Sequence, residues 1–262
     1  MSGYILCQRE QARSPYFIEA IHTNIYSIEE LCYYLYHNLE LADETLFNEG
    51  LCTWIQEELG MGELAARLRT RLGKGQALEE KIYPVFKSIN YLSYDELKKL
   101  NVHLKKLEQE TWEMRCKMRG DCFMENRMYG NAIHAYQKVL EKMEEKEEPK
   151  DAGKKGRVWN NLGCAYSYLF QKEKAAECFG KAYECLKDKK SLQTYLCALY
   201  WILPREEFEK RQQELRAEEE LGKEVLEKMK AIAGQPAQKV EIGEINGLLE
   251  EMIREYHRNT GF

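Results

Sequence analysis

Apolar residues along most of the chain recur at the spacing of amphipathic helices. Between residues 28 and 38 they form one stripe, made of Ile28, Leu31, Cys32, Leu35 and Tyr36. Ser27 lies three residues before Glu30, which is the spacing of a capping box, so a helix is predicted to begin at residue 28. The same periodicity follows Asp43, a candidate N-cap, and stops at Gly60, which predicts a second helix.

Three more helices are predicted before the middle of the chain. Two of them span residues 63–72 and 76–89. A longer helix is predicted from Ser93, where Glu96 completes a second capping box, to about residue 126. Residues 4–7 favour a short strand or an extended lead-in. The pattern as a whole indicates an all-α protein.

A distinct motif lies between residues 159 and 182. Large and small side chains occupy fixed intervals there. These residues are Trp159, Leu162, Gly163, Tyr166, Ala175, Phe179 and Ala182. This pattern resembles the tetratricopeptide repeat, a two-helix unit, at every position except the last, where Lys187 replaces the usual Pro. The small residues Gly163 and Ala175 would let the two helices cross closely.

Weaker copies of the motif flank it on both sides. Upstream, five residues lie 43 positions before their counterparts, namely Gly120, Phe123, Ala132, Tyr136 and Val139. The family period is about 34 residues, so a charged loop over 144–155 is expected to accommodate the extra length. Downstream, Leu196 and Tyr200 fit a third unit, but Cys197 replaces the Gly and Pro204 ends the helix early.

The resemblance is clear over about residues 113–203, and it implies an all-α helical-hairpin solenoid over residues 93–262. A long charged helix predicted over 205–232 and a last helix over 241–257 would supply the polar-backed cap that a solenoid needs. Residues 1–92 resemble no family and are predicted to form an N-terminal helical region, made either of degenerate helical pairs or of a separate helical module. The sequence therefore predicts two domains, divided between residues 92 and 93.

The composition agrees with a soluble helical protein. Of the 262 residues, 44% are hydrophobic and 32% charged, with only 5 Pro and 17 Gly. The 39 Lys and Arg against 44 Asp and Glu give a net charge of −5, so no overall positive field attracts nucleic acid or anionic lipid. No run approaches the roughly 18 apolar residues of a membrane-spanning helix. We therefore expect neither a nucleic-acid partner nor membrane insertion.

The nine cysteines indicate free thiols in a reducing compartment. Their number is odd, and no two of them form a Cys-x-x-Cys pair. Cys164, for example, lies between Gly163 and Ala165, where a packed helix favours a small apolar side chain. The first residues also lack the apolar core of a signal peptide. Together these observations predict a cytoplasmic location.

No familiar catalytic, metal or cofactor motif is present in the sequence. The five histidines are scattered, with no His-Glu-x-x-His and no zinc-ligand spacing to a cysteine. The chain also lacks a dinucleotide fingerprint, a phosphate-binding loop and a Gly-x-Ser-x-Gly elbow. We therefore predict no cofactor, no metal and no enzymatic activity, and a Cys–His pair assembled by folding is the weaker alternative.

The resemblance also implies where a ligand would bind. In tetratricopeptide proteins the first helices of successive repeats line a concave groove, and ligand contacts come from positions between the packing residues. The corresponding peptide-binding residues here are Lys117, Asp121, Met124, Asn160, Asn161, Cys164, Ser167 and Tyr168. Asn161 offers donors and an acceptor to a peptide backbone, although polar helix surface explains it equally well. Asp121 would repel a carboxylate, so the family's carboxylate clamp is not predicted.

Three functions follow from these observations. The first is a non-catalytic interaction scaffold or adaptor that binds a peptide or helix of a partner protein in the groove. The second is a regulatory sensor that responds to a peptide or small molecule. The third and weakest is an enzyme whose site lies in residues 1–92.

Overall fold

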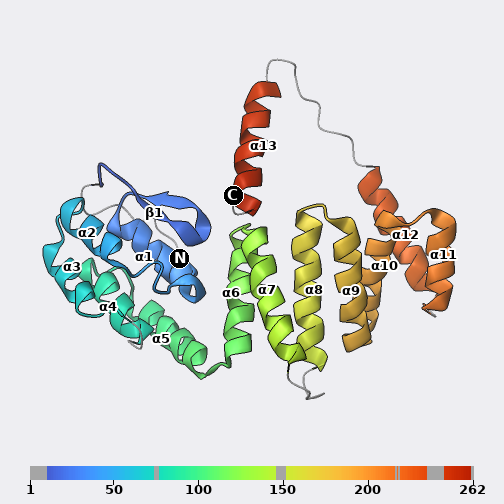
Figure 1. Ribbon diagram of the computed structural model, residues 1–262, viewed down its shortest axis with the longest axis horizontal. Coiled ribbons are helices and arrows are strands. Elements are labelled where there is room, and N and C mark those ends of the chain that lie inside the picture. Colours follow the sequence, from blue (N-terminus) through green and yellow to red (C-terminus); the bar gives the residue numbers. More distant parts are fainter. Residues whose placement is uncertain are drawn as a thin grey trace. The chain divides into compact units, whose positions relative to one another are not determined.

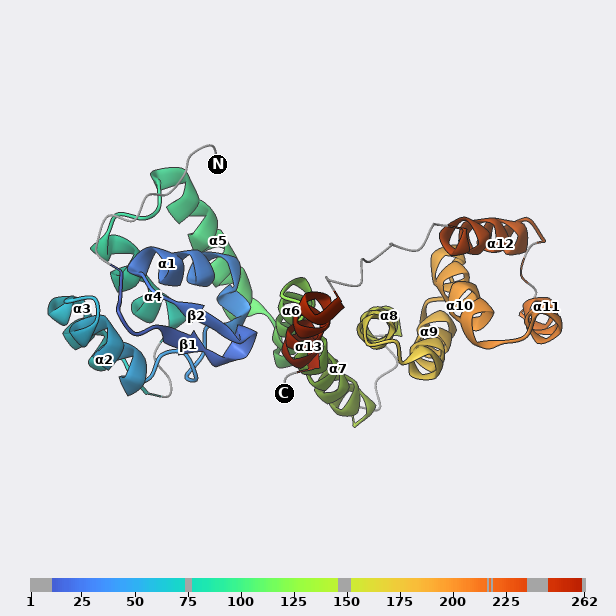
Figure 2. The same ribbon diagram turned by 90° about the horizontal axis from the view of Figure 1, so that it is seen from above.

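The protein is a series of helices grouped into two compact units, residues 1–122 and 123–262. The computed structural model describes residues 11–73, 77–145, 152–215, 217, 219–234 and 245–260. Figures 1 and 2 show the helices in two views. The strand predicted at residues 4–7 lies outside the described residues. The domain boundary predicted between residues 92 and 93 stays a prediction.

The first unit contains a small β-hairpin, six α-helices and two 3-10 helices, Glu19–Ile21 and Leu39–Leu41, among its described residues. The elements are β1 (Tyr16–Ile18), β2 (Thr23–Ile25), α1 (Ile28–His37), α2 (Glu49–Glu57), α3 (Gly62–Arg69), α4 (Leu78–Ser88), α5 (Tyr94–Gln109) and α6 (Trp112–Glu125), which runs across the division into the second unit. The strands are antiparallel, with Tyr16 opposite Ile25. Fully buried side chains from α1, α2, α3 and α4, such as Leu35, Ile55 and Leu68, form its core.

Two helices of the first unit begin at the predicted N-cap residues, Ser27 and Ser93. At Ser93 the capping box is complete, because the side chains of Ser93 and Glu96 each accept a backbone N–H of the other residue. At Ser27 the hydroxyl accepts the N–H of Glu30 as predicted, but the Glu30 carboxylate accepts the N–H of Tyr26. Both helices therefore begin where the sequence predicts.

Two predicted boundaries in this unit are wrong. The helix expected after Asp43 begins only at Glu49, because Asn48 is its N-cap and accepts the N–H of Leu51 at 2.9 Å. The helix expected from Ser93 to about residue 126 breaks between Gln109 and Trp112. The break has a local cause, since the Thr111 hydroxyl accepts the N–H of Met114 and so caps a new helix.

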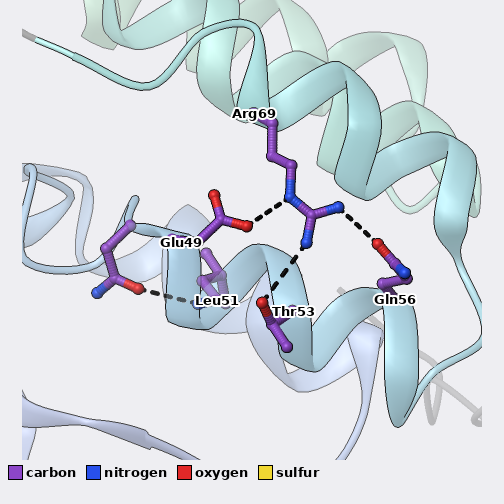
Figure 3. Close-up of polar contacts among 6 residues, drawn as sticks. Glu49, Leu51, Thr53, Gln56 and Arg69 are labelled. Carbon is purple, nitrogen blue, oxygen red and sulfur yellow. Dashed lines mark hydrogen bonds and ion pairs between the residues drawn. The ribbon is translucent and has the colours of Figure 1, made fainter.

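One arginine joins α2 to α3. Arg69, the last residue of α3, donates from Nε to Glu49 Oε1 at 2.6 Å and from a terminal nitrogen to Gln56 Oε1 at 2.5 Å. Its other terminal nitrogen lies 3.5 Å from Thr53 Oγ1. Figure 3 shows the guanidinium pointing at these three side chains of α2. The planar fork therefore spans about two turns of the neighbouring helix.

The second unit is a run of helices in which α7 to α10 pack each against the next. The elements are α7 (Tyr129–Glu144), α8 (Ala152–Tyr168), α9 (Lys172–Leu186), α10 (Lys189–Ile202), α11 (Arg205–Glu214), α12 (Glu219–Ala233) and α13 (Ile245–Thr260). The charged loop expected over 144–155 is wrong for residues 152–155, because α8 already begins at Ala152, and residues 146–151 lie outside the described residues. The fold is thus a tetratricopeptide-like array, as the motif predicts.

The single helix predicted over 205–232 is two helices. Here α11 ends at Glu214 and α12 begins at Glu219. Leu221 and Val225 of α12 pack with Phe208 of α11 against α10, so α12 covers the end of the array as a cap would. Helix α13 contacts α7 instead, and none of its residues is buried.

The two hairpin turns of the array have the same geometry 43 residues apart. Arg127 and Phe170 both adopt left-handed backbone conformations, with φ of 60° and 55°. The N–H of Met128 bonds to the carbonyl of Phe123 at 2.8 Å, and the N–H of Gln171 bonds to that of Tyr166 at 2.9 Å. The weaker upstream copy of the motif therefore forms the same turn as the clear one.

Candidate peptide-binding site

An aromatic cavity opens in the second unit where the turns of the array lie. Its volume is about 630 Å³, and its lining consists of Arg127, Tyr129, Ser167, Tyr168, Phe170, Trp201, Glu255 and Asn259. We call this the aromatic cavity. Its walls come from the start of α7, the α8–α9 turn, the end of α10 and the last turns of α13.

The cavity displays aromatic rings that the fold does not bury. Tyr168, Phe170 and Trp201 are 59%, 75% and 44% exposed. Tyr168 stacks on Tyr129 with ring centroids 4.5 Å apart and planes 6° apart, which fixes the position of both rings. Exposed aromatic side chains that cluster in this way mark a surface to which another molecule binds.

Charged groups of both signs surround these rings. Arg127 pairs with Glu255 of α13 at 3.2 Å. The ammonium group of Lys172 lies 5.1 Å from the centre of the Trp201 ring, a cation–π contact. Burial, together with the neighbouring Tyr168, raises the pKa of the Tyr129 hydroxyl, so Tyr129 is neutral and acts as a hydrogen-bonding group at physiological pH.

Ser167 contributes a polar oxygen to the cavity. Its hydroxyl donates to the Gly163 carbonyl of its own helix at 2.9 Å. The oxygen therefore remains available as an acceptor, for example for a peptide N–H. With aromatic faces, a cation and an acceptor in one place, the cavity is suited to binding a peptide segment.

The tetratricopeptide repeat family model matches residues 156–184. These residues form a tetratricopeptide repeat. They comprise most of α8 and α9, so the repeat supplies Ser167, Tyr168 and Phe170 to the cavity. No curated protein and no solved structure matches the chain significantly.

Two further properties of the described residues bear on function. Within the described part of the chain, no helix has the length and apolarity needed to cross a bilayer. Over the same residues, His, Cys, Asp and Glu side chains nowhere gather in threes as metal ligands would.

The structure brings together two of the eight predicted binding residues at the cavity. Ser167 and Tyr168 line it, whereas the other predicted residues of the repeat lie half-buried along α8, at Asn160, Asn161 and Cys164. Asn160 directs its amide toward Cys164 Sγ at 4.0 Å. Burial raises the pKa of the Cys164 thiol, which suits a packing residue better than a reactive one.

The remaining three predicted residues lie on α6. Met124 is half-buried in the second unit, near the first turn of the array. Lys117 and Asp121 belong to the first unit and form an ion pair with each other one helical turn apart. Their predicted role in binding stays a prediction.

Sequence reasoning missed most of the cavity lining. Trp201 lies 34 residues after Ser167, one family period, so it holds the same place in α10 that Ser167 holds in α8. Arg127 likewise lies 43 residues before Phe170, at the matching turn position. Extending the repeat alignment to these positions would have found Trp201, Arg127 and Phe170. Glu255 and Asn259 carry no such signal, because only the packing of α13 brings them to the cavity.

Proposed function

We propose that the second unit is a non-catalytic interaction module that binds a peptide or helix of a partner protein in the aromatic cavity. The observation that carries this proposal is the set of exposed rings of Tyr168, Phe170 and Trp201 beside a tetratricopeptide repeat. A repeat of this family indicates a protein-interaction domain, and Tyr, Trp and Arg dominate the binding energy of protein interfaces.

The lining suggests the chemistry of the bound segment. An aromatic or aliphatic side chain would fit between Tyr168 and Trp201, and its backbone N–H would reach the Ser167 oxygen. Arg127 and Lys172 favour an acidic residue beside that anchor, in competition with Glu255. The preferred peptide therefore combines an apolar anchor with an acidic neighbour.

A phage-displayed library of random peptides tests the proposal without knowledge of the natural partner. Peptides selected on the full chain are expected to bind the Tyr168→Ala, Trp201→Ala double variant roughly tenfold or more weakly. The control is Tyr94→Ala, because Tyr94 lies on α5 in the first unit and is 83% exposed. Undiminished binding by the double variant, at unchanged helicity and melting temperature, would show that the cavity is not the site.

A sensor is the second candidate function, because Glu255 and Asn259 of α13 form part of the lining. A ligand in the cavity would contact the repeat and α13 at the same time. Hydrogen exchange in α13 should then change when a selected peptide binds. Identical exchange with and without the peptide would contradict the sensor function and leave the scaffold function standing.

A further inference from the structure

An exposed apolar residue on α5 is surrounded by lysines. Val102 is 64% exposed, and four exposed lysines lie three or four residues from it, two on either side along the chain. They are Lys98, Lys99, Lys105 and Lys106. Residues three and four apart are neighbours on a helix surface, so all four lysines flank Val102. We call this surface the lysine face.

The lysine face points away from the core of the first unit. On a helix of 3.6 residues per turn, the four lysines lie within about 60° of Val102, whereas Leu100 and Leu104 lie about 160° from it. Both leucines are buried, at 3% and 1% exposure. Figures 1 and 2 show α5 at the edge of the first unit. The lysine face is therefore accessible to another molecule.

The fold leaves the charge of these lysines uncompensated. Within the described ranges of the chain, none of the four forms an ion pair with Asp or Glu. The acidic residues of α5 lie in its first and last turns, at Asp95, Glu96 and Glu108, and residues 97–107 hold four Lys and no acid. Exposed charges of one sign that lack partners within the chain favour a partner of the opposite sign.

The spacing of the lysines fits a second helix. Lys98 lies seven residues before Lys105, and Lys99 lies seven residues before Lys106. Seven residues correspond to about 10.5 Å along a helix axis, so acidic residues two turns apart on another helix match this distance. An apolar residue midway between them would cover Val102. An apolar centre within a charged rim is the usual arrangement of a protein interface.

Other anionic molecules fit the lysine face less well. Single-stranded nucleic acid binds by stacking its bases on aromatic rings, and the centre of this face is a valine. The net charge of −5 also repels a polyanion at long range. A helix that lies in a membrane surface inserts its apolar side, whereas the apolar side of α5 is buried at Leu100 and Leu104. An acidic protein segment is therefore the better fit.

We propose that the lysine face of α5 is a second interaction surface, which binds an acidic helical segment of a partner protein. It lies in the first unit and goes beyond the peptide binding proposed for the aromatic cavity. Pairs between exposed charges are individually weak and are screened by salt. The affinity is therefore modest and falls with ionic strength.

A designed helical peptide tests the proposal on the full chain. The probe carries the pattern Glu-Glu-x-x-Leu-x-x-Glu-Glu, which places four acids around one apolar residue as the lysines surround Val102. Measured by fluorescence anisotropy, it should bind roughly tenfold or more tightly than a helical peptide of the same composition in scrambled order. Added salt should weaken its binding. Equal affinity for the two peptides would overturn the proposal.

Charge reversal on α5 locates the contact. Lys98→Glu with Lys105→Glu should weaken binding of the probe roughly tenfold or more, because repulsion replaces attraction. The matched control is Lys138→Glu with Lys228→Glu, two exposed lysines on α7 and α12 whose exchange changes the net charge equally. The control should bind the probe as the natural chain does. An equal loss in both variants would show a response to net charge alone and would contradict a contact at α5.

A third variant separates this surface from the aromatic cavity. Tyr168→Ala with Trp201→Ala should bind the probe unchanged, so the two proposals can fail independently. Loss of binding in that variant would place the probe in the cavity and overturn the second surface. Polyuridylate, or phosphatidylserine vesicles, bound through Lys98 and Lys105 more tightly than the probe would assign the lysine face to a nucleic acid or a membrane instead.

Discussion

The backbone of Gly163 lies directly against the ring of Phe179. A Cβ atom placed on Gly163 would come within 2.7 Å of Phe179 Cε1, well inside van der Waals contact. Gly163 belongs to α8 and Phe179 to α9, so this contact sets the distance at which the two helices of the repeat cross.

The first prediction follows from that contact. Gly163→Leu should lower the free energy of unfolding by about 1–3 kcal/mol, because the new side chain must displace the Phe179 ring. Gly153→Leu is the matched control, since Gly153 lies in the first turn of α8, where the nearest side-chain atom is 3.9 Å from the added Cβ. Urea unfolding of both variants measures the difference. Equal stability of the two variants would contradict the crossing geometry.

The crossing of the repeat was predictable because it depends on residues close in sequence. The motif predicted that the small Gly163 lets the two helices cross closely, and the structure places the Gly163 backbone against the ring of Phe179. The complete capping box at Ser93 was predictable for the same reason, since its two partners are three residues apart. A contact within one helix hairpin or at one helix terminus can be predicted from the sequence, because its partners are close together along the chain.

Features that depend on weak or distant signals were not predictable. The hairpin of β1 and β2 has three residues a strand, too short to show an alternating pattern. The break at Thr111 interrupts a helical pattern without Gly or Pro. Glu255 enters the aromatic cavity through packing between α13 and α7, which are more than a hundred residues apart in sequence. The placement of Glu255 follows from tertiary packing and leaves no local trace in the sequence.

The second prediction concerns the link between α2 and α3. Arg69→Lys should lower stability by about 0.5–1.5 kcal/mol, because an ammonium group cannot bond to Glu49 and Gln56 at once as the guanidinium fork does. Arg67→Lys is the control, since Arg67 is largely exposed and lies 4.0 Å from its partner Glu63. Differential scanning calorimetry compares the two variants. A loss as large in the Arg67 variant would show that any exchange of Arg for Lys on α3, rather than the loss of the fork, is responsible.

The third prediction concerns the reactivity of a buried thiol. Burial, with a smaller contribution from the neighbouring Glu177, raises the pKa of Cys178 from about 9 to about 12. The thiolate fraction at pH 8 then falls by a factor of about a thousand. Alkylation of Cys178 by iodoacetamide in the folded chain should be at least about a hundredfold slower than in urea. Mass spectrometry of the Cys178 peptide measures both rates, and similar rates would mean that the thiol is accessible and ionised.

The fourth prediction is a pH dependence in the first unit. His103 Nε2 lies 2.8 Å from Glu40 Oε1, and this hydrogen bond raises the pKa of His103 above its usual 6.5. A pKa that is raised on folding means that the charged histidine stabilises the folded state. This stabilisation is fully present below the unfolded pKa and is lost as the pH rises through the folded pKa.

The variant His103→Gln isolates this effect. The difference in unfolding free energy between the natural chain and the variant should favour the natural chain near pH 5.5 and shrink toward about pH 8.5. His134→Gln, at an exposed position on α7, is the control and should leave the difference flat. Urea midpoints at closely spaced pH values measure these curves. If the advantage of His103 grew with rising pH instead, the neutral ring would be the stabilising form, and the ion pair with Glu40 would not hold α5 in place.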